Sequence, residues 1–163
     1  MIFYGWGFLP VFLFGKGEKD MIRKAEIKDY PAAAALAVQM WEHDPDELIQ
    51  EWEEADGSGE GAVFVAEETG RIVGFAQCGL RHDYVEGTDT SPVGYLEGIF
   101  VDSACRCRGY AARLLCACEN WAKEKGCREF ASDCELDNSD SLKFHLSLGF
   151  TEANRIICFT KNL

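Results

Sequence analysis

Basic residues are scarce in this 163-residue chain. Lysine and arginine total 16 against 28 aspartate and glutamate residues, which gives a formal net charge of −12. The charges of residues 1–20 cancel, so the excess of acid lies in residues 21–163. Nucleic-acid binding needs a surplus of Lys and Arg to meet the phosphates, so the composition argues against it. An acidic surface concentrates cations and favours a cationic ligand, although many acidic proteins are merely soluble.

The chain also lacks an apolar run long enough to cross a membrane. Its first 14 residues carry no charge, but a span needs about 20 apolar residues. No basic residue precedes Lys16 and no small-residue cleavage site follows, so a secretory signal is not expected. We interpret residues 1–20 as an extension outside the domain, with an anchor on a membrane surface as the alternative. The expected location is the cytoplasm, with no membrane partner.

The eight cysteines lack the spacing of a zinc site or of a disulfide framework. The chain is 47% hydrophobic and long enough to form a core without cross-links. The close pairs are Cys105 with Cys107 and Cys116 with Cys118, and neighbours two apart on a helix face away from each other. Several cysteines also lie inside apolar runs, as buried thiols do. We therefore expect reduced thiols and no metal.

The hydrophobic pattern of residues 21–163 predicts one α/β (α+β) domain. Strands are expected at residues 21–26, 62–67, 72–80, 94–101, 128–134, 150–152 and 156–160. Helices are expected at residues 31–41, 44–55, 109–125 and 138–148, with Asp29 and Asp44 as the caps of the first two. The order β-α-α-β-β-β-α-β-α-β-β implies a mixed, mostly antiparallel sheet of six to seven strands with helices on both faces.

The segment between the strand at 94–101 and the helix at 109–125 carries the strongest chemical signal. The first amides of a helix have no partner within it and lie at the positive end of its dipole. Gly109 lets the backbone approach an anion closely, while Arg106 and Arg108 add positive charge. These features predict a pyrophosphate site at 106–111, against the plainer interpretation of a tight turn with exposed arginines.

The string Arg106-Cys107-Arg108-Gly109-Tyr110-Ala111 resembles the acetyl-CoA loop of the GNAT superfamily of N-acetyltransferases. The strand before it and the Leu148-Gly149-Phe150 end of the last helix fit as well, so the resemblance covers residues 21–163. It implies the GNAT fold, acetyl-CoA as co-substrate, and a sheet that splays open after the strand at 94–101. The cofactor-binding residues that it implies are Ile99, Phe100, Val101, Arg106, Cys107, Arg108, Gly109, Tyr110, Ala111, Ala112, Asn138 and His145.

Two of these residues have a second interpretation. Asn138 begins the last predicted helix, so it is also a candidate cap. His145 stands where many members of the family carry a tyrosine that protonates the leaving thiolate. A histidine can serve as a general acid, but a helical histidine is more often packed or solvated.

Further strings narrow the resemblance to the small, dimeric bacterial aminoglycoside 6′-N-acetyltransferases. These strings are Arg81-His82-Asp83-Tyr84-Val85-Glu86-Gly87, Ser91-Pro92, Tyr95-Leu96-Glu97-Gly98, Gly126-Cys127-Arg128-Glu129 and Ala131-Ser132-Asp133. The resemblance implies a homodimer that acetylates the 6′-amine of an aminoglycoside. The substrate-contacting positions that it implies are Trp41, Tyr84, Glu97, Asp133 and, where an acidic residue is expected, Asn154.

The chemistry of these residues suits a polycationic sugar. Carboxylates bind ammonium groups through charge-assisted hydrogen bonds, and aromatic rings attract nearby cations. Asp44 lies at the rim of the acidic helix that could form the outer wall of the site. Glu97 is the candidate base, Asp133 assists it, and a backbone N–H near Val101 would stabilise the oxyanion of a direct attack on the thioester.

Two alternatives remain open from the sequence. One is a GNAT enzyme for another amine, such as a polyamine, a small metabolite or a protein. The other is a non-catalytic module that binds CoA or the drug. A cysteine acetyl carrier is not expected, because Cys134 lies beside Asp133 and a catalytic thiol needs an electropositive setting.

Overall fold

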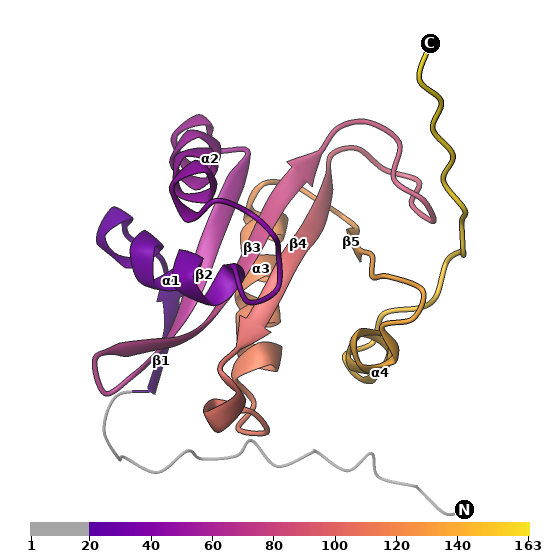
Figure 1. The fold of residues 1–163 in the computed structure, drawn as a ribbon. Coiled ribbons are helices and arrows are strands. Elements are labelled where there is room, and N and C mark those ends of the chain that lie inside the picture. Colours follow the sequence, from indigo (N-terminus) through magenta and orange to yellow (C-terminus); the bar gives the residue numbers. More distant parts are fainter. Residues whose placement is uncertain (1–19) are drawn as a thin grey trace, which may run out of the picture.

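The computed structural model describes residues 20–163, so the expectation for residues 1–19 lies outside the described part (Figure 1). One sheet runs in the order β1-β2-β3-β4-β5. Its strands are β1 (Asp20–Lys24), β2 (Gly61–Glu68), β3 (Arg71–Arg81), β4 (Val93–Val101) and β5 (Phe130–Ser132). The α-helices are α1 (Tyr30–Ala37), α2 (Pro45–Ser58), α3 (Tyr110–Glu124) and α4 (Ser139–Ser147), with short 3-10 turns at Ile27–Asp29 and Ser103–Cys105. In the described part, no helix is long and apolar enough to cross a membrane.

The sheet is mixed and mostly antiparallel, as expected. β1 to β4 pair antiparallel with their neighbours, whereas β4 and β5 pair in parallel. The parallel pairing covers only Gly94–Leu96 of β4 and Phe130–Ser132 of β5. Beyond Leu96, β4 has a strand partner on the β3 side alone within the described residues. The two strands therefore part in the middle of β4.

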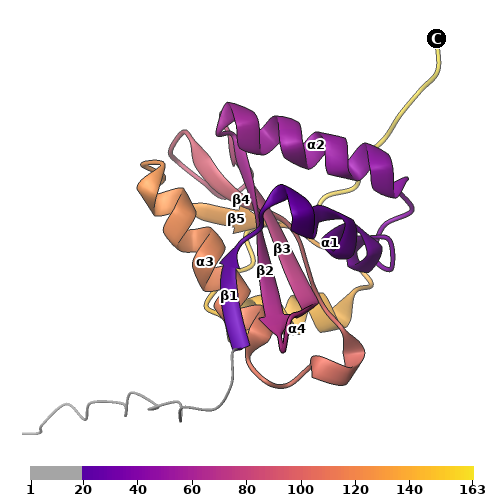
Figure 2. The same cartoon turned by 90° about the vertical axis from the view of Figure 1, so that its left-hand side faces the viewer.

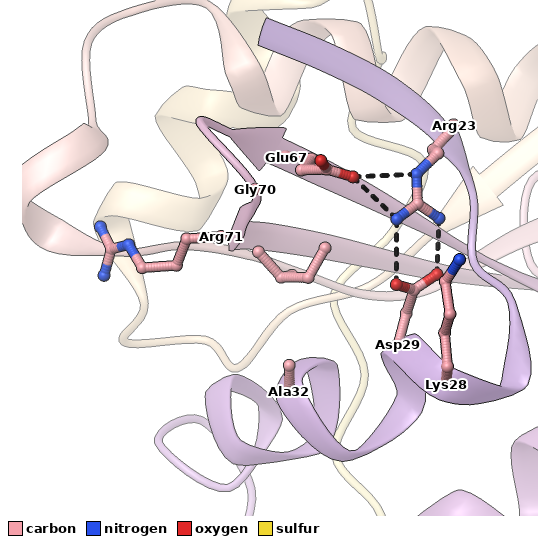
Figure 3. A pocket seen from close by; sticks show the side chains of 8 residues that line it. Arg23, Lys28, Asp29, Ala32, Glu67, Gly70 and Arg71 are labelled. Carbon is pink, nitrogen blue, oxygen red and sulfur yellow. Dashed lines mark hydrogen bonds and ion pairs between the residues drawn. The ribbon is translucent and has the colours of Figure 1, made fainter. Parts of the chain in front are cut away.

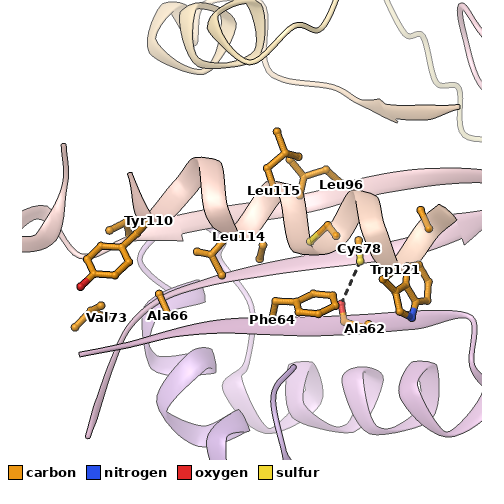
Figure 4. Packing of buried hydrophobic residues seen from close by; sticks show 14 of the residues in the cluster. Ala62, Phe64, Ala66, Val73, Cys78, Leu96, Tyr110, Leu114, Leu115 and Trp121 are labelled. Carbon is orange, nitrogen blue, oxygen red and sulfur yellow. Dashed lines mark hydrogen bonds between the residues drawn. The ribbon is translucent and has the colours of Figure 1, made fainter. Parts of the chain in front are cut away.

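Helices cover both faces of the sheet, which confirms the layer arrangement expected from the sequence (Figure 2). α1 and α2 bury one face, where the rings of Tyr30 and Phe75 each lie 5.7 Å from that of Trp52. α3 buries the other face with an apolar stripe at 3.6-residue spacing, which comprises Leu114, Leu115, Cys118, Trp121 and Ala122. Figure 4 shows Leu114 and Trp121 of that stripe against the strands.

Local sequence signals explain several element boundaries. The Asp44 carboxylate accepts from the amides of Asp46 at 2.9 Å and Glu47 at 3.2 Å, so it caps α2 as expected. The β2–β3 hairpin turns through Thr69 and Gly70, both with positive φ, and glycine adopts that conformation freely.

Asp29 precedes α1, but the expectation that its side chain caps this helix is wrong. Its carboxylate instead accepts from both terminal nitrogens of Arg23, at 2.5 and 2.9 Å, and from the Glu26 amide at 2.8 Å. Arg23 also donates to Glu67, so one guanidinium joins β1, β2 and the turn before α1 (Figure 3). The charged guanidinium of Arg23 attracts the Asp29 carboxylate more strongly than the neutral amides at the start of α1 do. The surface hollow beside the network contains none of the predicted site residues.

The strands expected at 150–152 and 156–160 do not form, so the sheet of residues 20–163 has five strands rather than six to seven. Residues 151–163 carry no regular structure, and all of them are exposed. Figure 1 shows the segment running away from the domain. An Ile-Ile-Cys-Phe-Thr sequence has β propensity, but a strand forms only where an edge is available to pair with it. The start of this segment lies close to Gly87, since a Cβ added to Gly87 would come within 2.4 Å of the Ala153 Cβ.

Candidate active site

A β-bulge in β4 sets the geometry of the site. Gln77 pairs with Gly98 and Cys78 pairs with Leu96, so Glu97 is the extra residue between them. In a regular strand Leu96 and Gly98 would share a face. Here Leu96 packs in the α3 core, whereas Gly98 lies against the indole of Trp41, to which an added Cβ would approach within 2.2 Å. The bulge falls just where β4 loses its β5 partner.

Glu97 and Asp133 belong to one cluster of charged and aromatic side chains. The Arg81 guanidinium donates to both oxygens of Glu97, at 2.8 and 3.3 Å, and lies 3.4 Å above the centroid of the Tyr95 ring. The Tyr95 hydroxyl donates to Asp133 at 2.6 Å. A continuous chain of contacts therefore connects the two carboxylates.

The electrostatics of this cluster favour its present protonation state. Burial raises the pKa of Tyr95, and its hydrogen bond to the Asp133 carboxylate raises it further. Burial works against the charged form of Arg81, but the bond to Glu97 and the nearby negative charges outweigh it and raise the pKa of Arg81. Tyr95 thus remains a neutral donor and Arg81 remains a cation at neutral pH.

Sequence reasoning gave no role to Tyr95 or Arg81. Tyr95 lies two residues before Glu97 on the same strand. Alternate residues of a strand point to one face, so this spacing could have indicated that the two side chains are close. Arg81 stands in one of the quoted strings, but its contact with Glu97 depends on the pairing of β3 with β4. That pairing is not readable from local sequence.

His145 lies beside the point where β4 and β5 part. Its Nε2 is 3.0 Å from the Ser132 hydroxyl, which in turn donates to the Leu96 carbonyl at 3.2 Å. Its Nδ1 is 2.7 Å from the Ser141 carbonyl, and a carbonyl only accepts, so Nδ1 carries a proton. The ring also packs edge-on against Phe150 at 5.0 Å. His145 is therefore packed and hydrogen-bonded, and its role as a general acid stays a prediction.

The loop expected to bind pyrophosphate makes a tight turn into α3. Cys107 and Gly109 both have positive φ, at 61° and 78°, and Gly109 is the N-cap position of α3. The two arginines are tied to the fold: Arg106 donates to the Val101 carbonyl at 3.0 Å, and Arg108 pairs with Glu68 at 2.6 Å. The turn brings the first amides of a 15-residue helix to the end of β4.

Three other predicted residues have contacts of their own. Trp41 is half-buried between Gly98 and the Phe75 ring, 5.9 Å away, which places it next to the bulge. Asn138 caps α4 by accepting from the Ser141 amide at 3.0 Å. Tyr84 is 79% exposed, and its hydroxyl donates to Glu86 at 3.0 Å.

The structure does not bring every predicted substrate-contacting residue to Glu97. The Asp44 carboxylate is engaged as the α2 cap, and the Asn154 side chain accepts from the neighbouring Arg155 amide at 2.8 Å. Asn154 lies in the exposed segment 151–163. The described contacts therefore connect Glu97 with Asp133 and place Trp41 against Gly98, the residue next to Glu97. None of them connects Tyr84, Asp44 or Asn154 with that cluster.

Comparison with known proteins assigns this architecture to a family. Residues 20–150 match the model of the Acetyltransferase (GNAT) family. The chain is 44% identical over 127 residues to an aminoglycoside N(6′)-acetyltransferase type 1 of Salmonella typhimurium strain LT2, covering 77% of this chain and 88% of the relative.

Two solved structures of the aminoglycoside N-acetyltransferase AAC(6′)-Iy are also similar, each at 39% identity. The one in complex with CoA has a TM-score of 0.86 and covers 93% of this chain and all of that one. The one in complex with the bisubstrate analogue CoA-S-monomethyl-acetylneamine has a TM-score of 0.83 and covers 90% of this chain and all of that one. The family match over residues 20–150 and the relative at 44% identity show that the chain belongs to the acetyltransferase (GNAT) family.

Proposed function

We propose that this protein transfers the acetyl group of acetyl-CoA to the 6′-amine of aminoglycoside antibiotics, acting in the cytoplasm. The observation that carries the proposal is the cluster of Glu97, Tyr95 and Asp133 at the point where β4 parts from β5. The named activity of the relatives and the CoA complexes of the similar structures support the same reaction. The function of a site rests on such groups rather than on the fold alone.

The cofactor would lie along the open edge of β4. The backbone groups of Ile99, Phe100 and Val101 would bind the pantetheine arm, because this part of β4 has no strand partner on the β5 side in the described residues. The amides of 107–112 would bind the pyrophosphate at the start of α3, where the helix dipole favours an anion. Asn138 and His145 would flank the arm from α4.

Acetyl transfer would proceed by direct attack of the amine. The 6′-ammonium gives a proton to Glu97, directly or through a water, and Asp133 holds a further positive charge of the acceptor. The free amine attacks the thioester carbonyl, and an N–H near Val101 stabilises the oxyanion. The nitrogen of the tetrahedral intermediate loses its second proton to solvent, and collapse of the intermediate breaks the C–S bond and releases the CoA thiolate, which takes a proton from His145 or from solvent. Holding both reactants in line supplies much of the acceleration.

The proposal includes a homodimer. Residues 151–163 carry Ile156, Ile157 and Phe159, and these large apolar side chains are strongly exposed. β5 is the edge strand of the described sheet, with β4 as its sole strand partner there. An extended apolar segment and an open strand edge are complementary surfaces. A second copy of the chain would therefore cover both, and it would bring Asn154 to a defined position.

The test is release of the CoA thiol from acetyl-CoA in the presence of kanamycin, of tobramycin, and of an analogue with a 6′-hydroxyl in place of the amine. The proposal expects rapid release with the two antibiotics and background release with the hydroxyl analogue. Release with polyamines but not with either antibiotic would assign the enzyme to another amine. Binding of kanamycin without thiol release would identify a non-catalytic module.

A further inference from the structure

The guanidinium of Arg81 occupies the place that the proposed function gives to a cation of the substrate. Its Nη2 lies 2.8 Å from one oxygen of Glu97, and its Nε lies 3.3 Å from the other. Its central carbon lies 3.4 Å above the Tyr95 ring. Both oxygens of the candidate base and the face of the neighbouring ring are therefore engaged by one internal cation.

An ammonium group needs the same two partners. It donates charge-assisted hydrogen bonds to carboxylate oxygens, and it is attracted to the face of an aromatic ring. The guanidinium and an incoming ammonium cannot both bind Glu97 in this way, because a carboxylate offers its best acceptor geometry to one bidentate partner. With Asp133 included, the cluster has two carboxylates and one guanidinium, so removal of Arg81 would leave two negative charges without a counter-cation.

The Arg81–Glu97 ion pair is exposed enough to solvent for another cation to displace Arg81. Arg81 is the last residue of β3, and its side chain is 44% exposed, against 32% for Glu97. Pairs exposed to this degree contribute little to stability, because solvent screens them. By contrast, the Asp29 side chain of the Arg23–Asp29 pair is only 7% exposed, and its carboxylate accepts hydrogen bonds from three donors.

We propose that Arg81 is a displaceable counter-cation, which the 6′-ammonium of the acceptor removes from Glu97 and Tyr95 when it binds. The inference rests on the proposed function and adds a residue that sets its specificity. Arg81 neutralises one of the two negative charges of the acceptor site in the free protein. It competes with an ammonium at the 6′ position, but it does not compete with a neutral group there.

Calorimetric titration of the CoA-bound protein with neomycin B and paromomycin I tests this role, because the two antibiotics differ only in a 6′-amine against a 6′-hydroxyl. In Arg81→Gln, the Kd of neomycin is expected to fall about threefold to fivefold, and that of paromomycin by less than about twofold. Arg128→Gln is the matched control. Arg128 is exposed, and its loss changes the net charge equally, so its effect on the ratio of the two Kd values is expected to be nil.

Two further measurements keep the test independent of the stability of one variant. In Arg81→Lys, which keeps the charge, the ratio of the two Kd values is expected to stay near that of the wild type. In the wild type itself, the side-chain NMR signal of the Arg81 Nε–H is expected to shift with neomycin and to stay in place with paromomycin.

These outcomes distinguish a failure of the role proposed for Arg81 from a failure of the proposed acetyltransferase function. Weaker neomycin binding by Arg81→Gln, or an equal change for both antibiotics, would overturn the role of Arg81 while leaving acetyl transfer intact. An Arg81 signal that neomycin leaves in place would do the same. A wild-type protein that binds neither antibiotic would overturn both proposals.

Discussion

Single residues at the β4 bulge decide whether the chemistry is possible. The bulge makes Glu97 an extra residue between two paired positions. Arg81 contacts both Glu97 and the Tyr95 ring, and the Tyr95 hydroxyl donates to Asp133. We expect Glu97→Gln to lower kcat by about a hundredfold or more, because the amide cannot accept the ammonium proton. The affinity for CoA, measured by calorimetry, should stay unchanged.

A matched charge change provides the control for that variant. Glu124 lies exposed at the end of α3, so Glu124→Gln should retain wild-type turnover. If Glu97→Gln turned over as fast as Glu124→Gln, Glu97 would have no part in proton removal.

Gly98 matters because of its neighbour rather than its flexibility. A Cβ at this position would lie 2.2 Å from the Trp41 ring, and an indole packed on Phe75 has little room to move. Gly98→Ala should therefore lower the free energy of unfolding by about 1–3 kcal/mol in urea titrations. It should also raise the KM for the acceptor, because Trp41 is displaced beside Glu97.

Gly57→Ala is the control for this prediction. No atom lies within 4 Å of the Cβ that it would add, and the residue belongs to α2. Alanine favours a helix over glycine by up to about 1 kcal/mol, so this variant should be as stable as the wild type or more so. Equal stability of the Gly98 and Gly57 variants would contradict the packing described for Trp41.

Residue roles could be predicted from the sequence only where a motif carried them. Glu97, Asp133 and Trp41 came from the resemblance; the structure connects Glu97 with Asp133 and places Trp41 against the adjacent Gly98. Arg81 and Tyr95 were missed because their roles arise from cross-strand contacts. Such contacts depend on register and on a bulge, which local patterns do not encode.

At the level of elements, the Arg23 network joins parts of the chain that are distant in sequence. Hydrogen bonds from Arg23 are the main cause that lowers the pKa of Asp29, against the opposing effect of burial. A carboxyl with a lowered folded pKa binds fewer protons than in the unfolded chain. Its stabilisation is therefore complete above its ordinary pKa range and is lost as pH falls through the lowered folded value.

We expect Asp29→Asn to destabilise the protein by about 2 kcal/mol at pH 7, because it leaves Arg23 with a weaker partner. The difference from the wild type should shrink as the pH of the urea titration is lowered. The exposed Asp137 provides the control, and Asp137→Asn should change neither quantity. A constant difference between Asp29→Asn and the wild type down to the acid limit would contradict the ionised pair.

Most elements could be predicted because their ends carry chemical signals. Asp44 caps α2, and Gly126 has positive φ just after α3. The strands predicted at 150–152 and 156–160 are wrong, because an apolar pattern shows β propensity but not whether a sheet edge is available for pairing. In the described chain, residues 151–163 have no such partner.

For the whole molecule, the exposed apolar end is the main argument for a dimer. We expect light scattering of the full chain to give twice the monomer mass. The double change Ile157→Lys with Phe159→Lys should shift the mass toward the monomer, because two charges cannot be buried in an apolar contact. Thr160→Lys, next to Phe159, adds a charge in the same segment without removing an apolar side chain and should leave the dimer intact. A monomeric wild type would contradict the homodimer.

The acidic charge of the whole molecule and its β4 cluster both point to a cationic acceptor, and one measurement tests that account most directly. The product of the reaction with kanamycin and acetyl-CoA can be isolated and its acetyl group located by NMR. We predict a single amide on the 6′ nitrogen. Acetylation at another nitrogen, or no acetylated product at all, would contradict the account.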